Sequence, residues 1–264
     1  MASIPNRDTS DTNVPPGHSE RELMPTTTGP TIVLVHGALT DASVWDEVIS
    51  RLQSDSYTVL APAMPLRTLA ADAKYLAAFL DTIEGPVVLA GHSYGGSIIS
   101  HPTSANDQVT ALVFVSAFQP DSGESTGQLN ARWPGSKLGE ATTLVRPYPG
   151  GNELYLRPES FAEVYAADLP AVTVARMAAT QRPIDPVALE ESFEGLPTWR
   201  QVPSWTLVST MDSSLPPDAE RAMAERAGST VLEVAASHAS PVSQPRAVVQ
   251  LILDAAADRV AAVH

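Results

Sequence analysis

Cysteine is absent from this chain of 264 residues, and basic side chains are scarce. Without cysteine the chain can form no disulfide, no thiolate metal site and no cysteine nucleophile, so covalent catalysis would have to use another side chain. Sixteen Lys and Arg stand against thirty Asp and Glu, which gives a net charge of -14. This charge repels phosphate backbones and anionic lipid surfaces, and it predicts that neither nucleic acid nor a membrane is a partner.

Long apolar runs and targeting signals are also missing. No apolar run approaches the roughly 18 residues that a membrane-spanning helix requires. Residues 1–29 contain no apolar segment typical of a signal peptide and are rich in Pro, Ser, Thr and Asp. We therefore expect a disordered tail at 1–29 and a cytoplasmic protein.

From residue 31 onward, short β-branched runs alternate with helical patterns. The runs TIVLV (31–35), YTVLA (57–61), PVVLAG (86–91) and VTALVFVS (109–116) predict strands buried on both faces of a sheet. SWTLVST (204–210) and TVLEVA (230–235) continue the pattern after a long interruption. Because helical spacing separates these runs, the sequence predicts an α/β fold with a mostly parallel, doubly wound sheet.

The interruption spans residues 118–202. Pro and Gly are dense from 119 to 151, and helical patterns at 159–168, 171–180 and 186–193 follow without clear strands. This composition predicts a helical cap inserted into the sheet domain, which would lie over a pocket. Trp133, Phe161 and Tyr165 are its candidate substrate-binding residues.

Gly91-His92-Ser93-Tyr94-Gly95 matches the pattern G-x-S-x-G directly between a strand and a helix. In that context Ser93 is a candidate nucleophile, exposed on a sharp turn. A purely structural turn or a phosphate-binding helix N-terminus would be the alternative, but neither G-x-G-x-x-G nor a P-loop is present.

A serine nucleophile needs a base, and His238 lies on a loop after the last predicted strand. His18, His36, His92, His101 and His264 are excluded by their positions in the tail, in strand ends, beside the serine or at the terminus. Asp212 follows the strand at 204–210 and completes the order Ser, Asp, His, while Asp121 is the alternative acid. The backbone N–H groups of Ala38 and Tyr94 are the candidate donors to an oxyanion.

The segments LVHGA (34–38), GHSYGG (91–96), STMDSSLPPDAERAMAERAG (209–228) and SHASPVSQP (237–245) resemble the α/β-hydrolase superfamily. The resemblance is closest to small bacterial esterase-like members related to plant methyl esterases and hydroxynitrile lyases. It implies a core of residues 30–117 and 203–264, with the cap at 118–202 inserted after the sixth strand. It also implies an acyl-enzyme mechanism on small-molecule esters, using Ser93, Asp212 and His238 without a metal or an organic cofactor.

Two other functions fit the same residues. A hydroxynitrile lyase would use polar cap groups, and Lys137, one of two lysines, lies in the cap region. A low-turnover ligand-binding receptor would keep the pocket without the chemistry. The sequence leaves the oligomeric state open.

Overall fold

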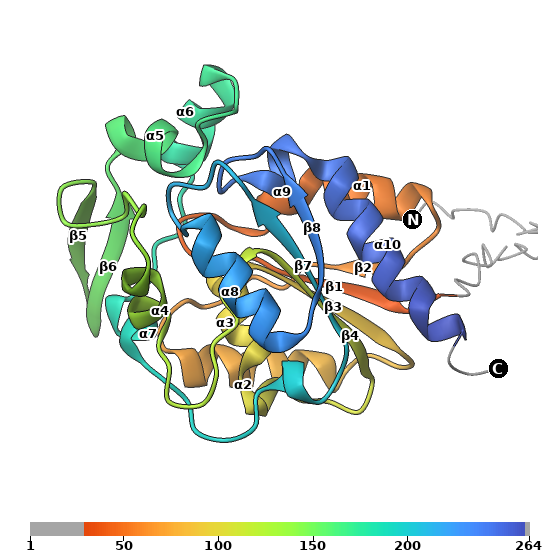
Figure 1. Cartoon of the computed structure of the whole chain (residues 1–264). Helices are drawn as coiled ribbons and strands as arrows, with labels where there is room; N and C mark the ends of the chain where they lie inside the picture. Colours follow the sequence, from red (N-terminus) through yellow and green to blue (C-terminus); the bar gives the residue numbers. More distant parts are fainter. Residues whose placement is uncertain (1–28, 262–264) are drawn as a thin grey trace, which may run out of the picture.

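The computed structural model describes residues 29–261 and consists of a six-stranded sheet with helices on both faces and an insertion at one end (Figure 1). All but Gly29 of the expected tail lies outside the described residues. The strands are β1 (Thr31–Val35), β2 (Val59–Leu60), β3 (Val87–Ser93), β4 (Val109–Ala117), β7 (Ser204–Ser209) and β8 (Thr230–Val234), with β5 (Thr143–Tyr148) and β6 (Gly151–Leu156) in the insertion.

The helices are α1 (Asp46–Ser54), α2 (Leu69–Leu80), α3 (Tyr94–Ser100), α4 (Thr126–Arg132), α5 (Phe161–Tyr165), α6 (Ala171–Ala179), α7 (Pro186–Glu190), α8 (Pro217–Ala227), α9 (Ser240–Ser243) and α10 (Pro245–Ala261). Asp41 caps the 3₁₀ turn that precedes α1, and its side chain accepts a hydrogen bond from the Ser43 N–H. Among residues 29–261, no helix combines the length and the apolar character needed to cross a bilayer.

The sheet has the order β2-β1-β3-β4-β7-β8, and every neighbouring pair is parallel. Alternate residues of the central strands β1, β3 and β4 enter different cores. Val33 and Val35 pack with α2 and α3, whereas Ile32 and Leu34 pack with α1 and α10. This two-sided burial explains the uninterrupted apolar runs and confirms the predicted doubly wound α/β fold.

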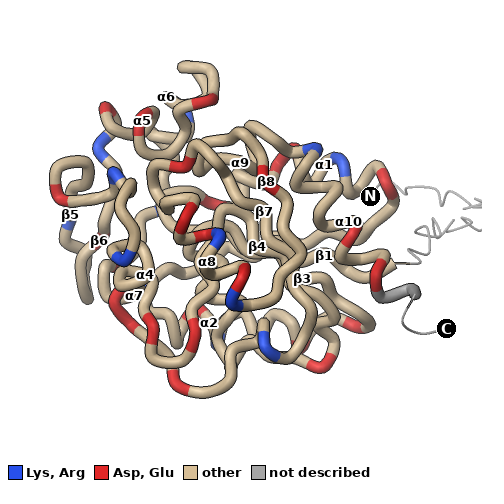
Figure 2. Tube along the Cα trace, in the orientation of Figure 1, with Lys and Arg blue, Asp and Glu red and all other residues tan. Residues whose placement is uncertain are grey.

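Charged residues are concentrated outside this sheet. Figure 2 shows the acidic residues on helices and loops around strands that are drawn almost entirely in tan. The strands β1, β3, β4 and β7 contain no charged residue. The net charge of -14 is therefore carried mostly by the outer layers.

Two details of the predicted insertion were wrong. The insertion follows β4, the fourth strand along the described chain and not the sixth. It is also not purely helical, because β5 and β6 form an antiparallel hairpin. This hairpin is half-exposed and contains Pro147, so it lacks the buried apolar run that marks the other strands.

Candidate active site

Ser93 lies at the turn between β3 and α3 with φ 55° and ψ -125°, a strained conformation for a residue other than glycine. The neighbouring glycines make this turn sterically feasible. A Cβ on Gly95 would lie 2.5 Å from the carbonyl oxygen of Val35, and a Cβ on Gly91 would lie 2.8 Å from the backbone of Gly95. The G-x-S-x-G pattern therefore follows from the close approach of strand, turn and helix.

Ser93, His238 and Asp212 form a continuous chain of hydrogen bonds. His238 Nε2 lies 2.8 Å from Ser93 Oγ, and His238 Nδ1 lies 2.5 Å from Asp212 Oδ2. Because a carboxylate only accepts, Nδ1 carries the proton and Nε2 presents its lone pair to the serine hydroxyl. All three residues are at most 6% exposed.

Asp212 is itself held by backbone donors. Its Oδ1 accepts the N–H groups of Ser214, at 2.7 Å, and of Leu215, at 2.9 Å. These bonds fix the carboxylate so that its other oxygen faces His238.

The alternative acid, Asp121, makes no hydrogen bond to His238. Its carboxylate forms an ion pair with Arg200 at 2.5 Å on the surface. The hydrogen bond from Arg200 lowers the pKa of Asp121. The structure thus brings Asp212, and not Asp121, to His238.

Two of the histidines excluded from the role of base have other contacts. His36 Nε2 accepts the Met64 N–H at 3.0 Å, and burial lowers the pKa of His36 to about 4. His92 does not line the cavity, and its Nε2 donates to the carbonyl oxygen of His238 at 2.9 Å. Its contact with the main chain of His238 was not expected from the sequence. Burial lowers the pKa of His92 well below its ordinary value, so its ring is neutral.

The candidate oxyanion donors flank Ser93. Tyr94 is the first residue of α3, where backbone N–H groups have no acceptor inside the helix. Gly37 packs so tightly on the nucleophile that a Cβ there would lie 2.6 Å from Ser93 Cβ. This contact places the 36–38 turn, with Ala38, directly beside the serine, and both Ala38 and Tyr94 line the cavity.

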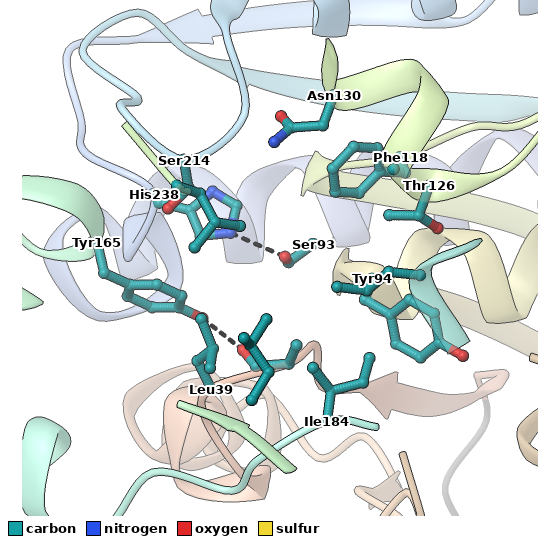
Figure 3. Close-up of a pocket in the computed structure, with 15 residues that line it drawn as sticks. Leu39, Ser93, Tyr94, Phe118, Thr126, Asn130, Tyr165, Ile184, Ser214 and His238 are labelled. Atoms are coloured by element: carbon teal, nitrogen blue, oxygen red, sulfur yellow. Dashed lines mark hydrogen bonds between the residues drawn. The ribbon is translucent and has the colours of Figure 1, made fainter. Parts of the chain in front are cut away.

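A narrow, mostly apolar cavity of about 60 Å³ opens above Ser93 (Figure 3). Figure 3 shows the Ser93 hydroxyl facing His238, with Tyr165, Leu39 and Ile184 on one side and Phe118 and Thr126 on the other. The lining consists of Ala38, Leu39, Ser93, Tyr94, Phe118, Thr126, Gly127, Asn130, Leu138, Leu154, Tyr165, Ile184, Leu189, Ser214 and His238.

Of the three predicted substrate-binding residues, only Tyr165 lines this cavity. Phe161 is fully buried behind it, with the two ring centroids 5.1 Å apart. Trp133 packs instead on the cluster that contains Leu129 and Met223. The corrections arise because helical spacing reveals that a side chain is buried but not which neighbour buries it.

Lys137, considered for lyase chemistry, lies outside the cavity lining. Its Nζ pairs with Glu163 Oε1 at 2.8 Å, and the two side chains are 48% and 65% exposed. The ammonium group is therefore directed to the surface of the insertion.

Two further carboxyl groups are buried near the site. Tyr94 Oη donates to Asp72 Oδ2 at 3.0 Å, and burial raises the pKa of Asp72 to about 6. Glu220 of α8 is fully buried, and its Oε1 has no hydrogen-bond partner. Burial, followed by the charge of Asp212, raises the pKa of Glu220 well above its ordinary value. Within residues 29–261, no group of three His, Asp or Glu side chains is arranged to hold a metal ion.

Comparisons with known proteins show the family and the fold of the chain. A family model described as the alpha/beta hydrolase family matches residues 32–251. A pyrethroid hydrolase of Sphingobium wenxiniae is 27% identical over 254 residues, which cover 84% of this chain and 86% of the relative. The solved structure of polyneuridine aldehyde esterase matches with a TM-score of 0.72 at 22% identity, over 86% of this chain and 98% of that one. A methylesterase from Arabidopsis matches with a TM-score of 0.68 at 17% identity, over 86% and 98% of the two chains.

Proposed function

Because this chain belongs to the alpha/beta hydrolase family, we propose that it hydrolyses carboxylic esters through an acyl-enzyme on Ser93. His238 is the base, and Asp212 is the acid that orients it. The observation that carries the proposal is the hydrogen-bonded chain from Ser93 through His238 to Asp212 at the floor of an apolar cavity.

In the first half of the reaction, Ser93 Oγ attacks the ester carbonyl carbon while its proton passes to His238 Nε2. Asp212 stabilises the imidazolium that forms. When the tetrahedral intermediate collapses, the bond to the alcohol oxygen breaks and His238 returns the proton to the departing alcohol. The product of this half is an acyl group esterified to Ser93.

In the second half, His238 Nε2 takes a proton from water, and the resulting hydroxide equivalent attacks the acyl carbon. The bond to Ser93 Oγ then breaks, the serine regains its proton from His238, and the carboxylic acid leaves. In both halves the negative charge forms on the carbonyl oxygen, where the N–H groups of Ala38 and Tyr94 are the proposed donors. Loss of one such donor costs about 3 to 4 kcal/mol of transition-state stabilisation in other enzymes.

The substrate we propose is a small-molecule ester with an apolar acyl group, because the cavity beside Ser93 is narrow and lined mainly by aliphatic and aromatic side chains. The names of the relatives, a pyrethroid hydrolase and two esterases, are consistent with this class. The proposed activity needs no metal and no organic cofactor. We propose that the protein acts in the cytoplasm.

The test is a panel of para-nitrophenyl esters of increasing acyl length, assayed with the wild type and Ser93→Ala. We expect turnover that is greatest for short acyl chains and is lost in the variant, whose fold is checked by circular dichroism. Equal turnover by the two proteins would refute Ser93 as nucleophile. If the wild type cleaves no ester, two further results separate the alternatives. Cyanide release from cyanohydrins would indicate the lyase, and ligand binding without turnover would indicate the receptor.

A further inference from the structure

The segment Val164–Asp168, at the end of α5 and in the turn that follows, contacts three of the four segments that carry the proposed chemistry: the Asp212 loop, the turn at 36–38 (the oxyanion turn) and the His238 loop. Its first contact is with the Asp212 loop, because Ser214 Oγ donates to the carbonyl oxygen of Val164 at 3.0 Å. Its second is with the oxyanion turn, because Tyr165 Oη lies 3.4 Å from the carbonyl oxygen of Ala38 (Figure 3). The insertion is therefore anchored to the site itself.

The third and most extensive contact is with the loop that carries His238. Asp168 Oδ2 accepts the backbone N–H of Ser237 at 3.1 Å, and Asp168 Oδ1 accepts the Ser237 hydroxyl at 2.5 Å. Both carboxylate oxygens thus hold the residue immediately before His238. Ser237 is only 2% exposed, so water cannot readily replace these two acceptors.

The main chain on the other side of His238 is held as well. The carbonyl oxygen of His238 accepts from His92 Nε2 at 2.9 Å, and the N–H of Ala239 donates to the carbonyl oxygen of Tyr165 at 3.0 Å. The Tyr165 ring stands edge-on to the imidazole, with centroids 4.7 Å apart and an interplanar angle of 82°. The Ser237 hydroxyl also lies 3.2 Å from the carbonyl oxygen of Tyr165, but Asp168 is the group that binds both the N–H and the hydroxyl of Ser237.

We propose that Asp168 is a positioning residue for His238: by binding the N–H and the hydroxyl of Ser237, it sets the imidazole at the distance from Ser93 that proton transfer requires. This inference rests on the proposed function of Ser93 and His238. Asp168 touches neither the substrate nor the reacting atoms, so it acts on the rate of proton transfer and leaves substrate binding unchanged. Misplacing a reacting group by about 1 Å can cost about a hundredfold in rate.

The test compares Asp168→Ala and Asp168→Asn with the matched control Glu163→Gln. Glu163 lies in α5, five residues from Asp168, and its carboxylate pairs with the Lys137 ammonium at the surface, where both side chains are largely exposed. We expect Asp168→Ala to lower kcat about 10- to 100-fold with KM within about twofold of the wild type. Asp168→Asn keeps one accepting oxygen, so its kcat should lie between those of Asp168→Ala and the wild type. The kcat of Glu163→Gln should match that of the wild type.

Counting active sites distinguishes a positioning role of Asp168 from a purely structural one. Each variant is titrated with a para-nitrophenyl alkylphosphonate, which labels an activated serine, and kcat is expressed per labelled site. The rate of labelling of Asp168→Ala should fall by about the same factor as kcat. Unchanged kcat per site, or a loss explained entirely by fewer labelled sites, would overturn the proposal.

If Asp168→Ala does not fold, Ser237→Ala provides the second test. It removes the hydroxyl bond to Asp168, together with the weaker hydroxyl contacts to the Tyr165 carbonyl oxygen at 3.2 Å and the Ala239 N–H at 3.3 Å, and it keeps the N–H bond to Asp168. We expect a severalfold lower labelling rate, and a rate equal to the wild type would overturn the proposal. Failure of the proposed function looks different: wild type and Ser93→Ala would then behave alike towards esters and phosphonate.

Discussion

Gly37→Ala should disable the site without replacing any residue of the proposed triad. The added Cβ would lie 2.6 Å from Ser93 Cβ, 2.7 Å from the carbonyl oxygen of His92 and 3.1 Å from Ser93 Oγ. Carbon atoms in contact prefer about 3.5 to 4.0 Å, so the turn and the serine must separate by about 1 Å. A displacement of this size predicts about a hundredfold loss of kcat/KM.

The assay measures hydrolysis of a short para-nitrophenyl ester and the rate of phosphonate labelling of Ser93, together with a thermal melt. Gly139→Ala is the matched control, because no atom lies within 4 Å of the position that its Cβ would take. The control should retain full activity. We expect overpacking in Gly37→Ala to cost about 1 to 3 kcal/mol of stability, so the protein should still be folded when assayed. A folded Gly37→Ala with wild-type labelling would refute the close packing of the oxyanion turn on the nucleophile.

Four other substitutions test the carboxyl groups. Asp212→Asn should lower kcat about 10³- to 10⁴-fold, because an amide favours the wrong tautomer of His238. Asp121→Asn should change kcat less than about threefold, since a surface ion pair contributes little. Similar losses of kcat in both variants would contradict the assignment of Asp212 as the acid. Asp72→Asn should become more stable relative to the wild type as pH rises from 4 to 8. Because the folded-state pKa of Asp72 is raised to about 6, the wild type loses stability as pH rises through that value, and urea unfolding at several pH values measures the difference. Glu220→Gln should likewise become more stable relative to the wild type as pH rises, and this gain in relative stability should begin above pH 4.5, because burial raises the pKa of Glu220 from the ordinary value of 4.5. A difference between variant and wild type that does not change with pH would rule out a buried ionisable group at either position.

The parts of the fold that the sequence predicted are those whose residues satisfy one strong local requirement. The runs around Ile32 and Val113 had to be apolar throughout because both faces of the strands are buried. Gly91 and Gly95 had to be glycine because the backbone of a neighbour occupies the place of a Cβ. Such requirements are visible in a single sequence.

The parts that were missed depend on partners distant in the chain. The β5–β6 hairpin is half-exposed and includes Pro147, so it produced no strand pattern. Helix α4 was also missed, although Ser125 and Gln128 form a capping box, a signal that the sequence did contain. The contact of His92 with the His238 carbonyl joins residues 146 positions apart, and no local pattern encodes it.

Covalent trapping is the most direct test of whether Ser93 is an activated nucleophile. The wild type is treated with a para-nitrophenyl alkylphosphonate, digested and analysed by mass spectrometry, with Ser93→Ala and His238→Ala treated in parallel. We expect one phosphonyl adduct per chain, on the peptide containing Ser93, which is absent in Ser93→Ala and forms far more slowly in His238→Ala. An adduct on another residue, or none in the folded wild type, would contradict the assignment of Ser93 as nucleophile.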